Sequence, residues 1–258
     1  MRIGLIAGSG VQDLYEGETL VEQTVATDYG EVPVRLLTLD DERELVFLAR
    51  HGKGHSIPPH RINYRANIRA FVELGCCCVL ATNAVGSMNG QLQPGDFAVC
   101  NQFLDFTKQR PLTFFDAEDG DVRHVNVTEP YCATLRETLR EGCMAALGKT
   151  LHTTSTYVCA EGPRFETAAE IEMYRQLGGD VVGMTGVPEV VLAREAGLCY
   201  ATVCVVSNWA AGIANDEVSH SEVEELMATR RSDLKCLLRE TISLITDNED
   251  CACRRPFG

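Results

Sequence analysis

The sequence predicts a single α/β domain in which helices pack on a central sheet. Short apolar runs typical of buried strands alternate along the chain with stretches of helical periodicity. Glycine and polar residues gather where the apolar runs end, which is where ligands bind in α/β sheets. No linker rich in Pro, Gly or Ser interrupts the 258 residues. We therefore expect one domain over residues 1–247, followed by a polar tail over residues 248–258.

The first third of the chain contains the clearest strands. Each is a short apolar run that ends at glycine or polar residues. Between two of them lies a stretch with helical spacing that stops at Gly75, a residue type that commonly ends helices. We expect strands at Ile3–Ala7, Glu44–Ala49 and Cys76–Ala81, and a helix over Asn63–Leu74.

The remaining elements follow the same alternation. Glycines close several of the amphipathic stretches, and Ser219 or Ser221 is expected to cap the last helix, with a glutamate three residues later. The expected helices are Pro130–Leu147, Ala168–Leu177, Val190–Ala196 and Ser221–Asp247. The expected strands are Thr156–Cys159 and Tyr200–Val206, with Asp180–Gly183 leading into Met184.

Charge and hydropathy limit the possible partners. The net charge of −14 argues against nucleic acid, because binding its phosphates requires clustered Lys and Arg. No apolar run approaches the roughly 20 residues needed to cross a bilayer, and the apolar part of the N-terminus is too short for a signal peptide. We expect a cytoplasmic protein without a membrane partner. If its substrate is an anion, the site must supply cations or backbone donors against the overall negative charge.

The twelve cysteines do not have the spacing of a zinc framework. Cys76-Cys77-Cys78 is a continuous run, and no paired CxxC motifs follow it. Most of the cysteines are expected to be small buried apolar residues. Cys251-Ala252-Cys253 lies on the polar tail, where we expect it to be exposed and either redox-active or disulfide-bonded.

Several residues at predicted strand ends have the chemistry of an oxyanion site. Gly8-Ser9-Gly10 offers backbone N–H groups and a hydroxyl, although a tight turn explains the same pattern. Arg50 would supply a forked cation and His51 a second donor; a surface salt bridge is the alternative. Further candidate donors are Asn83, Ala84 and Thr185.

A second group of residues could recognise a heterocycle. Phe165 and Glu166 are adjacent in Glu161-Gly162-Pro163-Arg164-Phe165-Glu166-Thr167, and they could stack on and hydrogen-bond to a base. The alternative is that Glu166 and Thr167 cap the following helix. Asn208 follows an apolar strand, where an asparagine otherwise only forms a turn.

The order of these segments resembles the trimeric purine nucleoside phosphorylase and methylthioadenosine phosphorylase family. The resemblance runs from about residue 3 to about residue 245. Its most specific segments are Glu161–Thr167, Gly183-Met184-Thr185-Gly186-Val187-Pro188-Glu189 and Val206-Ser207-Asn208-Trp209-Ala210-Ala211-Gly212. Other matching segments are Leu48–Gly52, Ile62–Asn67 and Thr82–Ser87.

The resemblance implies the nucleoside phosphorylase fold, a mixed central sheet flanked by helices. It also implies a homotrimer, or a dimer of trimers, in which His124 is a candidate residue lent to a neighbouring subunit. Inorganic phosphate would be a co-substrate, and neither metal nor organic cofactor is implied. The implied phosphate site is Ser9, Arg50, His51, Asn83, Ala84 and Thr185, with the hydroxyl of Ser9 standing where the family often has threonine. The implied nucleoside site is Phe165, Glu166, Met184, Asn208, Trp209, Ala210 and His220, and the catalytic residues would be Asn208, Glu166, Arg50 and His51.

The same resemblance suggests the substrate. Adenine-specific members carry aspartate and serine where this chain has Asn208 and Glu166, so a 6-oxopurine nucleoside is expected. His220 falls where 6-oxopurine enzymes bind the 5′-hydroxyl, although an ordinary helix-start residue is the alternative. We expect reversible phosphorolysis of inosine and guanosine to free base and ribose 1-phosphate, a purine salvage reaction. The runner-up is an S-methyl-5′-thioinosine phosphorylase, ahead of a methylthioadenosine phosphorylase.

Other classes fit the sequence less well. A nucleoside hydrolase would need an aspartate-rich calcium site, and a dinucleotide-dependent oxidoreductase would need the full glycine fingerprint. Neither pattern is present in the sequence. A nucleoside-sensing relative without activity stays open, although it would not need a phosphate site.

Overall fold

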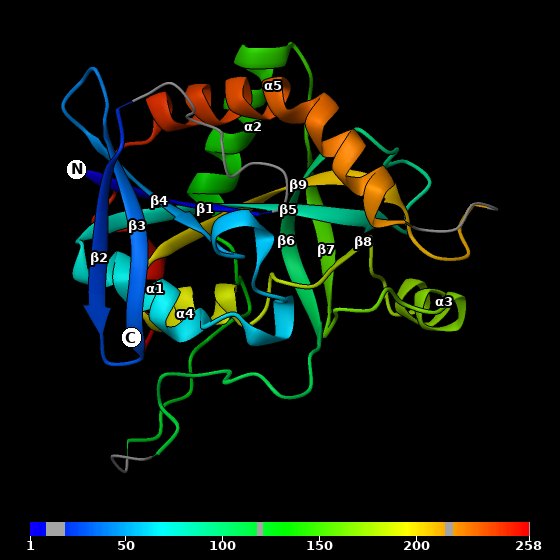
Figure 1. Ribbon diagram of the computed structural model, residues 1–258, viewed down its shortest axis with the longest axis horizontal. Helices are drawn as coiled ribbons and strands as arrows, with labels where there is room; N and C mark the ends of the chain where they lie inside the picture. The colour runs from blue at the N-terminus through cyan, green and yellow to red at the C-terminus, as the bar shows by residue number, and fades with distance from the viewer. Residues whose placement is uncertain (9–18, 118–120, 215–218, 258) are drawn as a thin grey trace.

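The computed structural model describes residues 1–8, 19–117, 121–214 and 219–257. Helices cover both faces of one mixed sheet (Figure 1). Two of them, α2 and α5, pack on each other and on one face, and α1 and α4 pack together on the opposite face. The α/β fold with a mixed central sheet and flanking helices, expected from the sequence, is confirmed.

The described strands form one sheet in the order β2-β3-β4-β1-β5-β8-β7-β6-β9. Their bounds are β1 Arg2–Ala7, β2 Val21–Thr27, β3 Gly30–Thr38, β4 Glu44–Ala49, β5 Cys76–Ser87, β6 Phe97–Phe106, β7 His152–Ala160, β8 Val181–Gly183 and β9 Cys199–Trp209.

The helices connect or flank these strands. The α-helices are α1 Tyr64–Glu73, α2 Ala133–Leu147, α3 Ala168–Gln176, α4 Glu189–Glu195 and α5 His220–Leu244. Three short 3₁₀ segments are η1 Lys53–His55, η2 Pro59–Arg61 and η3 Ala252–Arg254. Among the described residues, no helix is both long enough and apolar enough to span a membrane.

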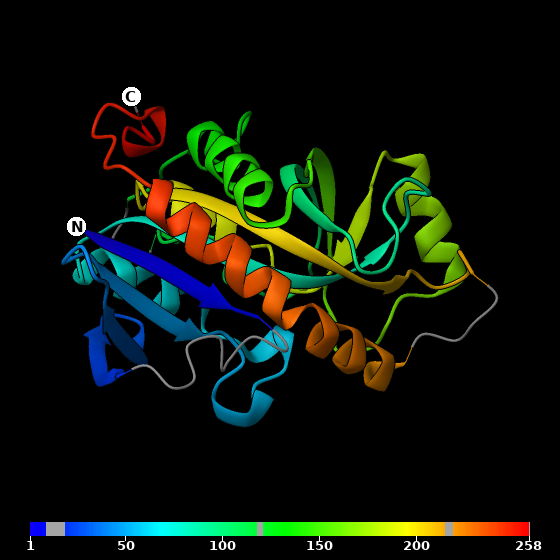
Figure 2. The same ribbon diagram turned by 90° about the horizontal axis from the view of Figure 1, so that it is seen from above.

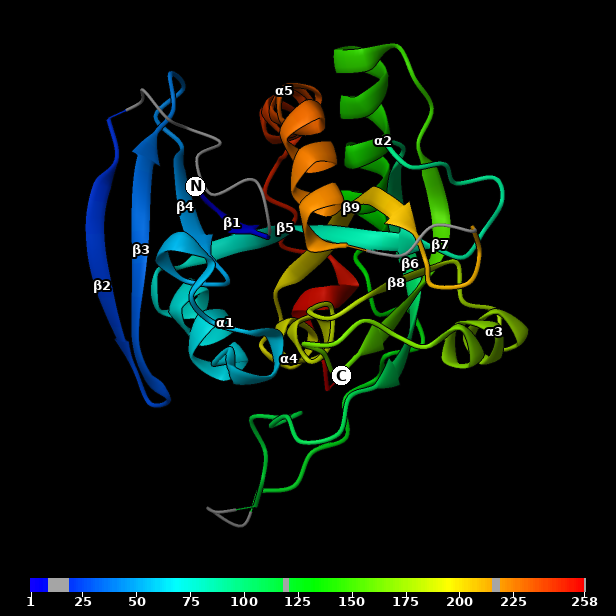
Figure 3. The same cartoon turned by 45° about the vertical axis from the view of Figure 1, so that its right-hand side comes forward.

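The pairings divide the sheet into an open part and a closed part. The hairpin β2–β3 and strand β4 lie at one edge (Figure 3), and β1 pairs in parallel with both β4 and β5. Beyond β1, strand β5 pairs with both β8 and β9, and β9 also pairs with β6, so that β5-β8-β7-β6-β9 closes into a ring. The closure brings residues of β5 and β9, which lie more than a hundred positions apart, into register beside each other.

Strands β5, β7 and β9 run further than the sequence predicted. The expected end of Cys76–Ala81 was wrong, because β5 continues through Asn83 to Ser87. Its second half pairs with β9, and a register shift between Val85 and Gly86 bends the strand there. An asparagine and a glycine that read locally as a strand end are therefore held in the sheet by long-range pairing.

The sequence prediction missed the β2–β3 hairpin and β6. In β2, only Val25 is buried, so the strand has little apolar signal. Pro33 interrupts the β3 pattern, and proline is tolerated because β4 pairs only from Arg35 onward, leaving the other side of Pro33 unpaired.

Side-chain caps fix the starts of three helices. The side chain of Asn63 accepts from the backbone N–H of Ala66 at the start of α1. Thr167 and Glu170 form a capping box on α3, and Ser219 and Glu222 form one on α5. The second box confirms Ser219 as the cap of the last helix.

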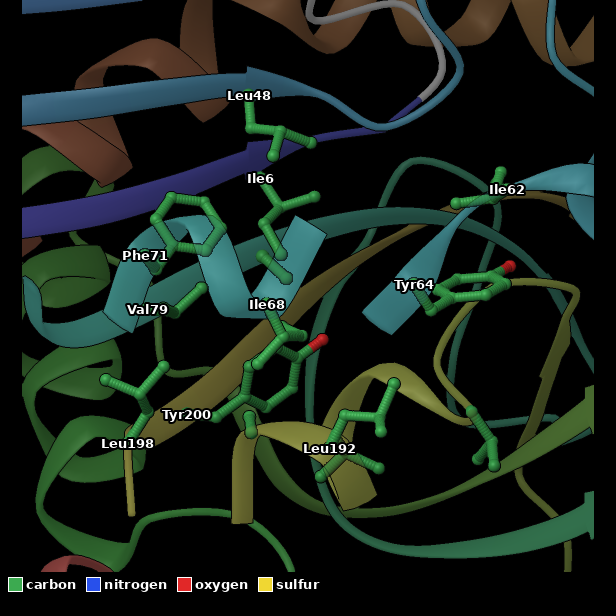
Figure 4. Packing of buried hydrophobic residues seen from close by; sticks show 14 of the residues in the cluster. Ile6, Leu48, Ile62, Tyr64, Ile68, Phe71, Val79, Leu192, Leu198 and Tyr200 are labelled. Atoms are coloured by element: carbon green, nitrogen blue, oxygen red, sulfur yellow. The ribbon is translucent and has the colours of Figure 1, made fainter. Parts of the chain in front are cut away.

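Two large apolar clusters hold the helices to the sheet. One lies between the sheet and α1 with α4; Ile6, Ile68, Phe71 and Tyr200 interdigitate there (Figure 4). The other lies on the opposite face, under α2 and α5. Seen from above, α5 crosses the strands obliquely (Figure 2), and its first turn reaches the region where β4 ends.

Candidate active site

A cavity of about 410 Å³ opens among the segment after β4, the second halves of β5 and β9, the segment before α3, β8 with the residues that follow it, and the start of α5. Eleven of the thirteen site residues predicted from the sequence or resemblance line it: Arg50, His51, Asn83, Ala84, Phe165, Glu166, Met184, Thr185, Asn208, Ala210 and His220. Of the other two, Ser9 lies outside the described residues, although its neighbour Gly8 lines the cavity. Trp209 is treated below.

Arg50 is held at the wall of the cavity by three hydrogen bonds to two partners. Its Nε and Nη2 donate to the two carboxylate oxygens of Glu189, each at 2.7 Å, and its Nη1 donates to the carbonyl of Thr82 at 2.8 Å. A guanidinium has five N–H groups, so two remain for a ligand. The interpretation of Arg50 as a surface salt-bridge residue was wrong, because its side chain is fully buried.

Glu189 is the partner that the sequence analysis did not single out. It is fully buried and also accepts from the hydroxyl of Tyr200 at 2.6 Å. Burial by itself lowers the pKa of Arg50, but the carboxylate of Glu189 outweighs that effect and raises it above its ordinary value. The positive charge facing the cavity is therefore permanent and already balanced by a buried carboxylate.

His51 is neutral in this environment. Burial, and then the charge of Arg50, lower its pKa to about 3. Its Nδ1 lies 2.9 Å from the carbonyl of Ile57, so Nδ1 carries the proton and donates. The other nitrogen, Nε2, then has a lone pair. The expectation that His51 serves as a second donor was wrong for the neutral ring, because its free nitrogen accepts.

Asn83 and Thr185 are joined across the cavity wall. The hydroxyl of Thr185 donates to Oδ1 of Asn83 at 2.8 Å, and Nδ2 of Asn83 donates to the hydroxyl of Thr202 at 2.7 Å. The backbone N–H of Thr185 donates to the Tyr157 hydroxyl. These contacts fix both side chains beside Arg50 without introducing charge.

Glu166 has an unpaired oxygen in the same cavity. Its Oε1 is buried and accepts no hydrogen bond from any residue that the structure describes. Burial, as the main cause, raises the pKa of this carboxyl. A buried carboxylate oxygen without a donor is costly, so its presence indicates a ligand that supplies one. Capping explains Thr167 but not Glu166, because Glu170 completes the box on α3.

These residues and the fold agree with comparisons to known proteins. The family model described as "Phosphorylase superfamily" matches residues 2–243. The chain belongs to this superfamily.

Individual relatives match over nearly the full length. The 6-oxopurine nucleoside phosphorylase of Pyrococcus furiosus is 52% identical, over 98% of this chain and 96% of that protein. A probable S-methyl-5′-thioinosine phosphorylase of Methanopyrus kandleri is 48% identical, over 97% and 95% of the two chains. The solved methylthioadenosine phosphorylase of Schistosoma mansoni in complex with adenine superposes with a TM-score of 0.89 at 34% identity, covering 95% of this chain and 91% of the other.

Asn208 is held at the end of β9 in this phosphorylase. Its Nδ2 donates to the carbonyl of Trp209, and its Oδ1 lies 2.7 Å from the hydroxyl of Ser207. The Trp209 side chain does not join it in the main cavity. Trp209 lines a second cavity of about 430 Å³, which Ser207 and Asn208 also line.

Three histidines gather at one part of the cavity. The rings of His51 and His55 stack with centroids 4.1 Å apart, and His55 lies 5.9 Å from His220. The sequence analysis missed His55, although its position four residues after His51, in a turn with two glycines, was a usable signal. His220 Nε2 lies 3.4 Å from a carboxylate oxygen of Glu224, one helical turn along α5.

His124 is not among the residues that line the cavity. It is exposed, in a segment between β6 and α2 that contains no helix or strand in its described part.

Proposed function

We propose that this phosphorylase cleaves the 6-oxopurine nucleosides inosine and guanosine with inorganic phosphate, giving free base and ribose 1-phosphate reversibly. The observation that carries the proposal is the unpaired, buried carboxylate oxygen of Glu166 in the cavity that also contains Arg50. Inosine and guanosine present an N1–H that can donate to this oxygen. Adenosine presents a lone pair at N1, which would leave the carboxylate unsatisfied.

Phosphate would bind at Arg50, His51, Asn83, Ala84 and Thr185, together with Ser9. The two remaining N–H groups of Arg50 would donate to the anion. The lone pair on Nε2 of neutral His51 would accept from the P–OH of HPO₄²⁻, which keeps one proton near neutral pH. Thr185 would donate to the anion by rotating its hydroxyl away from Asn83.

The cavity would favour the charges that develop during cleavage. Breaking the bond between C1′ and N9 leaves positive charge on the sugar and negative charge on the base. A bound phosphate dianion would stabilise the sugar cation and then form the new bond at C1′. Asn208 would stabilise the departing base at N7, and Glu166 would hold its N1–H; Phe165, Met184 and Ala210 would line the base and ribose.

The observation that favours a second substrate is the environment of His220. The side chain is 57% exposed and paired with Glu224, and the apolar Val223 lines the cavity one turn away. A methylthio group in place of the 5′-hydroxyl would pack on Val223. S-methyl-5′-thioinosine is therefore the alternative, and the Methanopyrus relative carries that name.

We further propose a cytoplasmic homotrimer acting in purine salvage, with His124 of one subunit completing the site of its neighbour. An exposed segment without helix or strand suits such a contact. Mass photometry or analytical ultracentrifugation would test the trimer, and His124→Ala would test the lent residue through the KM for nucleoside.

The substrate proposal is tested by following free base from inosine, guanosine, adenosine, S-methyl-5′-thioinosine and S-methyl-5′-thioadenosine, each with and without phosphate. We expect phosphate-dependent cleavage of inosine and guanosine and neither adenine nucleoside cleaved. Cleavage of S-methyl-5′-thioinosine alone would keep the base assignment and replace the sugar assignment. Rapid cleavage of adenosine would contradict the role given to Glu166.

A further inference from the structure

Four cysteines from three distant parts of the chain converge away from the active site. Cys132 precedes α2, Cys199 begins β9, and Cys251 and Cys253 belong to the C-terminal tail. Their Sγ atoms all lie within 4.8 Å of one another, and Cys132 and Cys251 are 3.8 Å apart. The expectation of an exposed tail motif was wrong, because Cys253 is only 6% exposed. The end of the C-terminal segment lies near α4 (Figure 3), and Arg254 and Pro256 come within 4 Å of a Cβ placed at Gly197, just after α4.

We propose that Cys132, Cys199, Cys251 and Cys253 form a structural site for one thiophilic divalent cation of the zinc class. Zinc bound by four thiolates is tetrahedral with Zn–S bonds of about 2.3 Å, which places its sulfurs about 3.8 Å apart. The sulfurs of Cys132 and Cys251 already lie 3.8 Å apart, and no other pair in the cluster exceeds this separation by more than about 1 Å.

The mutual proximity of all four sulfurs distinguishes a single ion from the other cysteine assemblies. Two neighbouring disulfides would also gather four sulfurs, but the 3.8 Å between the Sγ atoms of Cys132 and Cys251 exceeds the roughly 2.05 Å of an S–S bond. In a four-iron cluster each cysteine binds a different iron, which spreads the sulfurs further apart than when they share one ion. All twelve cysteines are free thiols in the structure.

The surroundings suit a negatively charged metal–thiolate centre. Cys132 occupies the N-cap of α2, where the helix dipole favours a thiolate. Arg254, in the tail, reaches to the core: its Nη2 lies 3.4 Å from the carbonyl of Cys77 and pairs with Asp247, and the residue lines the same small pocket as three of the four cysteines. Binding would release the thiol protons to solvent as the four Zn–S bonds form.

The site would fasten the tail to the core. Cys132 and Cys199 belong to one rigid unit, because the N–H of Cys132 donates to the carbonyl of Tyr200 at 2.8 Å. Cys251 and Cys253 bracket the 3₁₀ turn Ala252–Arg254. Beyond it, Phe257 packs edge-on against Phe115, with ring centroids 5.3 Å apart. The ion would thus hold a tail segment whose end supports the loop after β6.

The test compares two double variants with the intact protein, purified under reducing conditions without chelators. Zinc per chain is measured by inductively coupled plasma mass spectrometry. We expect about one zinc per chain in the unaltered protein, at least a tenfold loss with Cys251→Ser plus Cys253→Ser, and no change with Cys236→Ser plus Cys143→Ser, whose thiols lie outside the cluster. Phosphorolysis of inosine checks that each variant is folded.

A cobalt titration provides a second measurement that does not depend on what the protein acquired during expression. Co²⁺ added to the reduced, metal-free protein should give the visible bands of tetrahedral cobalt thiolate, saturating at about one equivalent and disappearing on addition of zinc. The absence of these bands while all thiols remain free would overturn the proposal. Intact mass showing two disulfides among these four cysteines in protein purified anaerobically would also overturn it.

Discussion

Replacing Glu189 with glutamine separates the two contributions of the buried Arg50–Glu189 pair, stability and charge balance. Both side chains are fully buried and joined by two 2.7 Å hydrogen bonds. Removing one member of a buried ion pair costs about 3–5 kcal/mol, because the other charge is left uncompensated. Glutamine keeps the volume and one acceptor oxygen, so we expect the lower end, about 3 kcal/mol. For a domain of this size that lowers Tm by about 6–12 °C.

The same substitution should strengthen phosphate binding. With Glu189 neutral, the full charge of Arg50 faces the anion, and phosphate replaces the lost carboxylate as its counter-ion. We expect phosphate to bind on the order of tenfold more tightly, a gain of ~1.4 kcal/mol. Phosphate should then raise Tm more in the Glu189→Gln variant than in the unaltered protein. Differential scanning fluorimetry across a phosphate series measures both effects.

Two variants serve as controls for this experiment. Tyr200→Phe removes one hydrogen bond to the same carboxylate, so it should lower stability by about 1.5–3 kcal/mol without changing the affinity for phosphate. Arg50→Met combined with Glu189→Met replaces the pair with apolar groups and should recover most of the stability while losing the phosphate response. A Glu189→Gln variant whose Tm and phosphate response match the unaltered protein would refute the charge-balance reasoning.

Three further substitutions test other parts of the molecule. Because burial raises the pKa of Glu166, the carboxylate should be lost as an acceptor when pH falls through a value above that of an ordinary glutamate, and kcat/KM for inosine should decrease there. Glu166→Gln should remove this acid limb of the pH profile and lower kcat/KM at least about tenfold. The Tm of the variant should be unchanged or higher. A pH profile with the same limb in the variant would assign it to another group. His220→Val should lower kcat/KM for inosine about tenfold and raise it for S-methyl-5′-thioinosine, and an equal effect on both would exclude a 5′ contact. Gly142→Ala should lower the free energy of unfolding by about 1–3 kcal/mol in chemical denaturation. The new Cβ would overlap Thr241 of α5, whose backbone nitrogen lies 2.8 Å from that position. An unchanged denaturation midpoint would mean that α2 and α5 can separate freely.

The local features of this chain determined much of the fold and the composition of the site. Apolar periodicity and capping residues are short-range signals, and they identified the strand Glu44–Ala49, the ends of α1 and the cap at Ser219. Family-specific segments identified eleven residues that meet in one cavity. The edge hairpin β2–β3 escaped prediction, because a mostly exposed strand has little apolar pattern to read.

Only the tertiary structure decided the properties that depend on neighbours distant in sequence. The pairing of Arg50 with Glu189 spans 139 positions and balances the charge of the cavity. The neutrality of His51 depends on burial and on Arg50, and the unpaired oxygen of Glu166 depends on what surrounds it. The four-cysteine cluster joins residues 132, 199, 251 and 253, whose spacing matches no metal motif. Burial, protonation and ligand geometry depend on which groups the folded chain brings together, so the spacing of residues along the sequence could not reveal them.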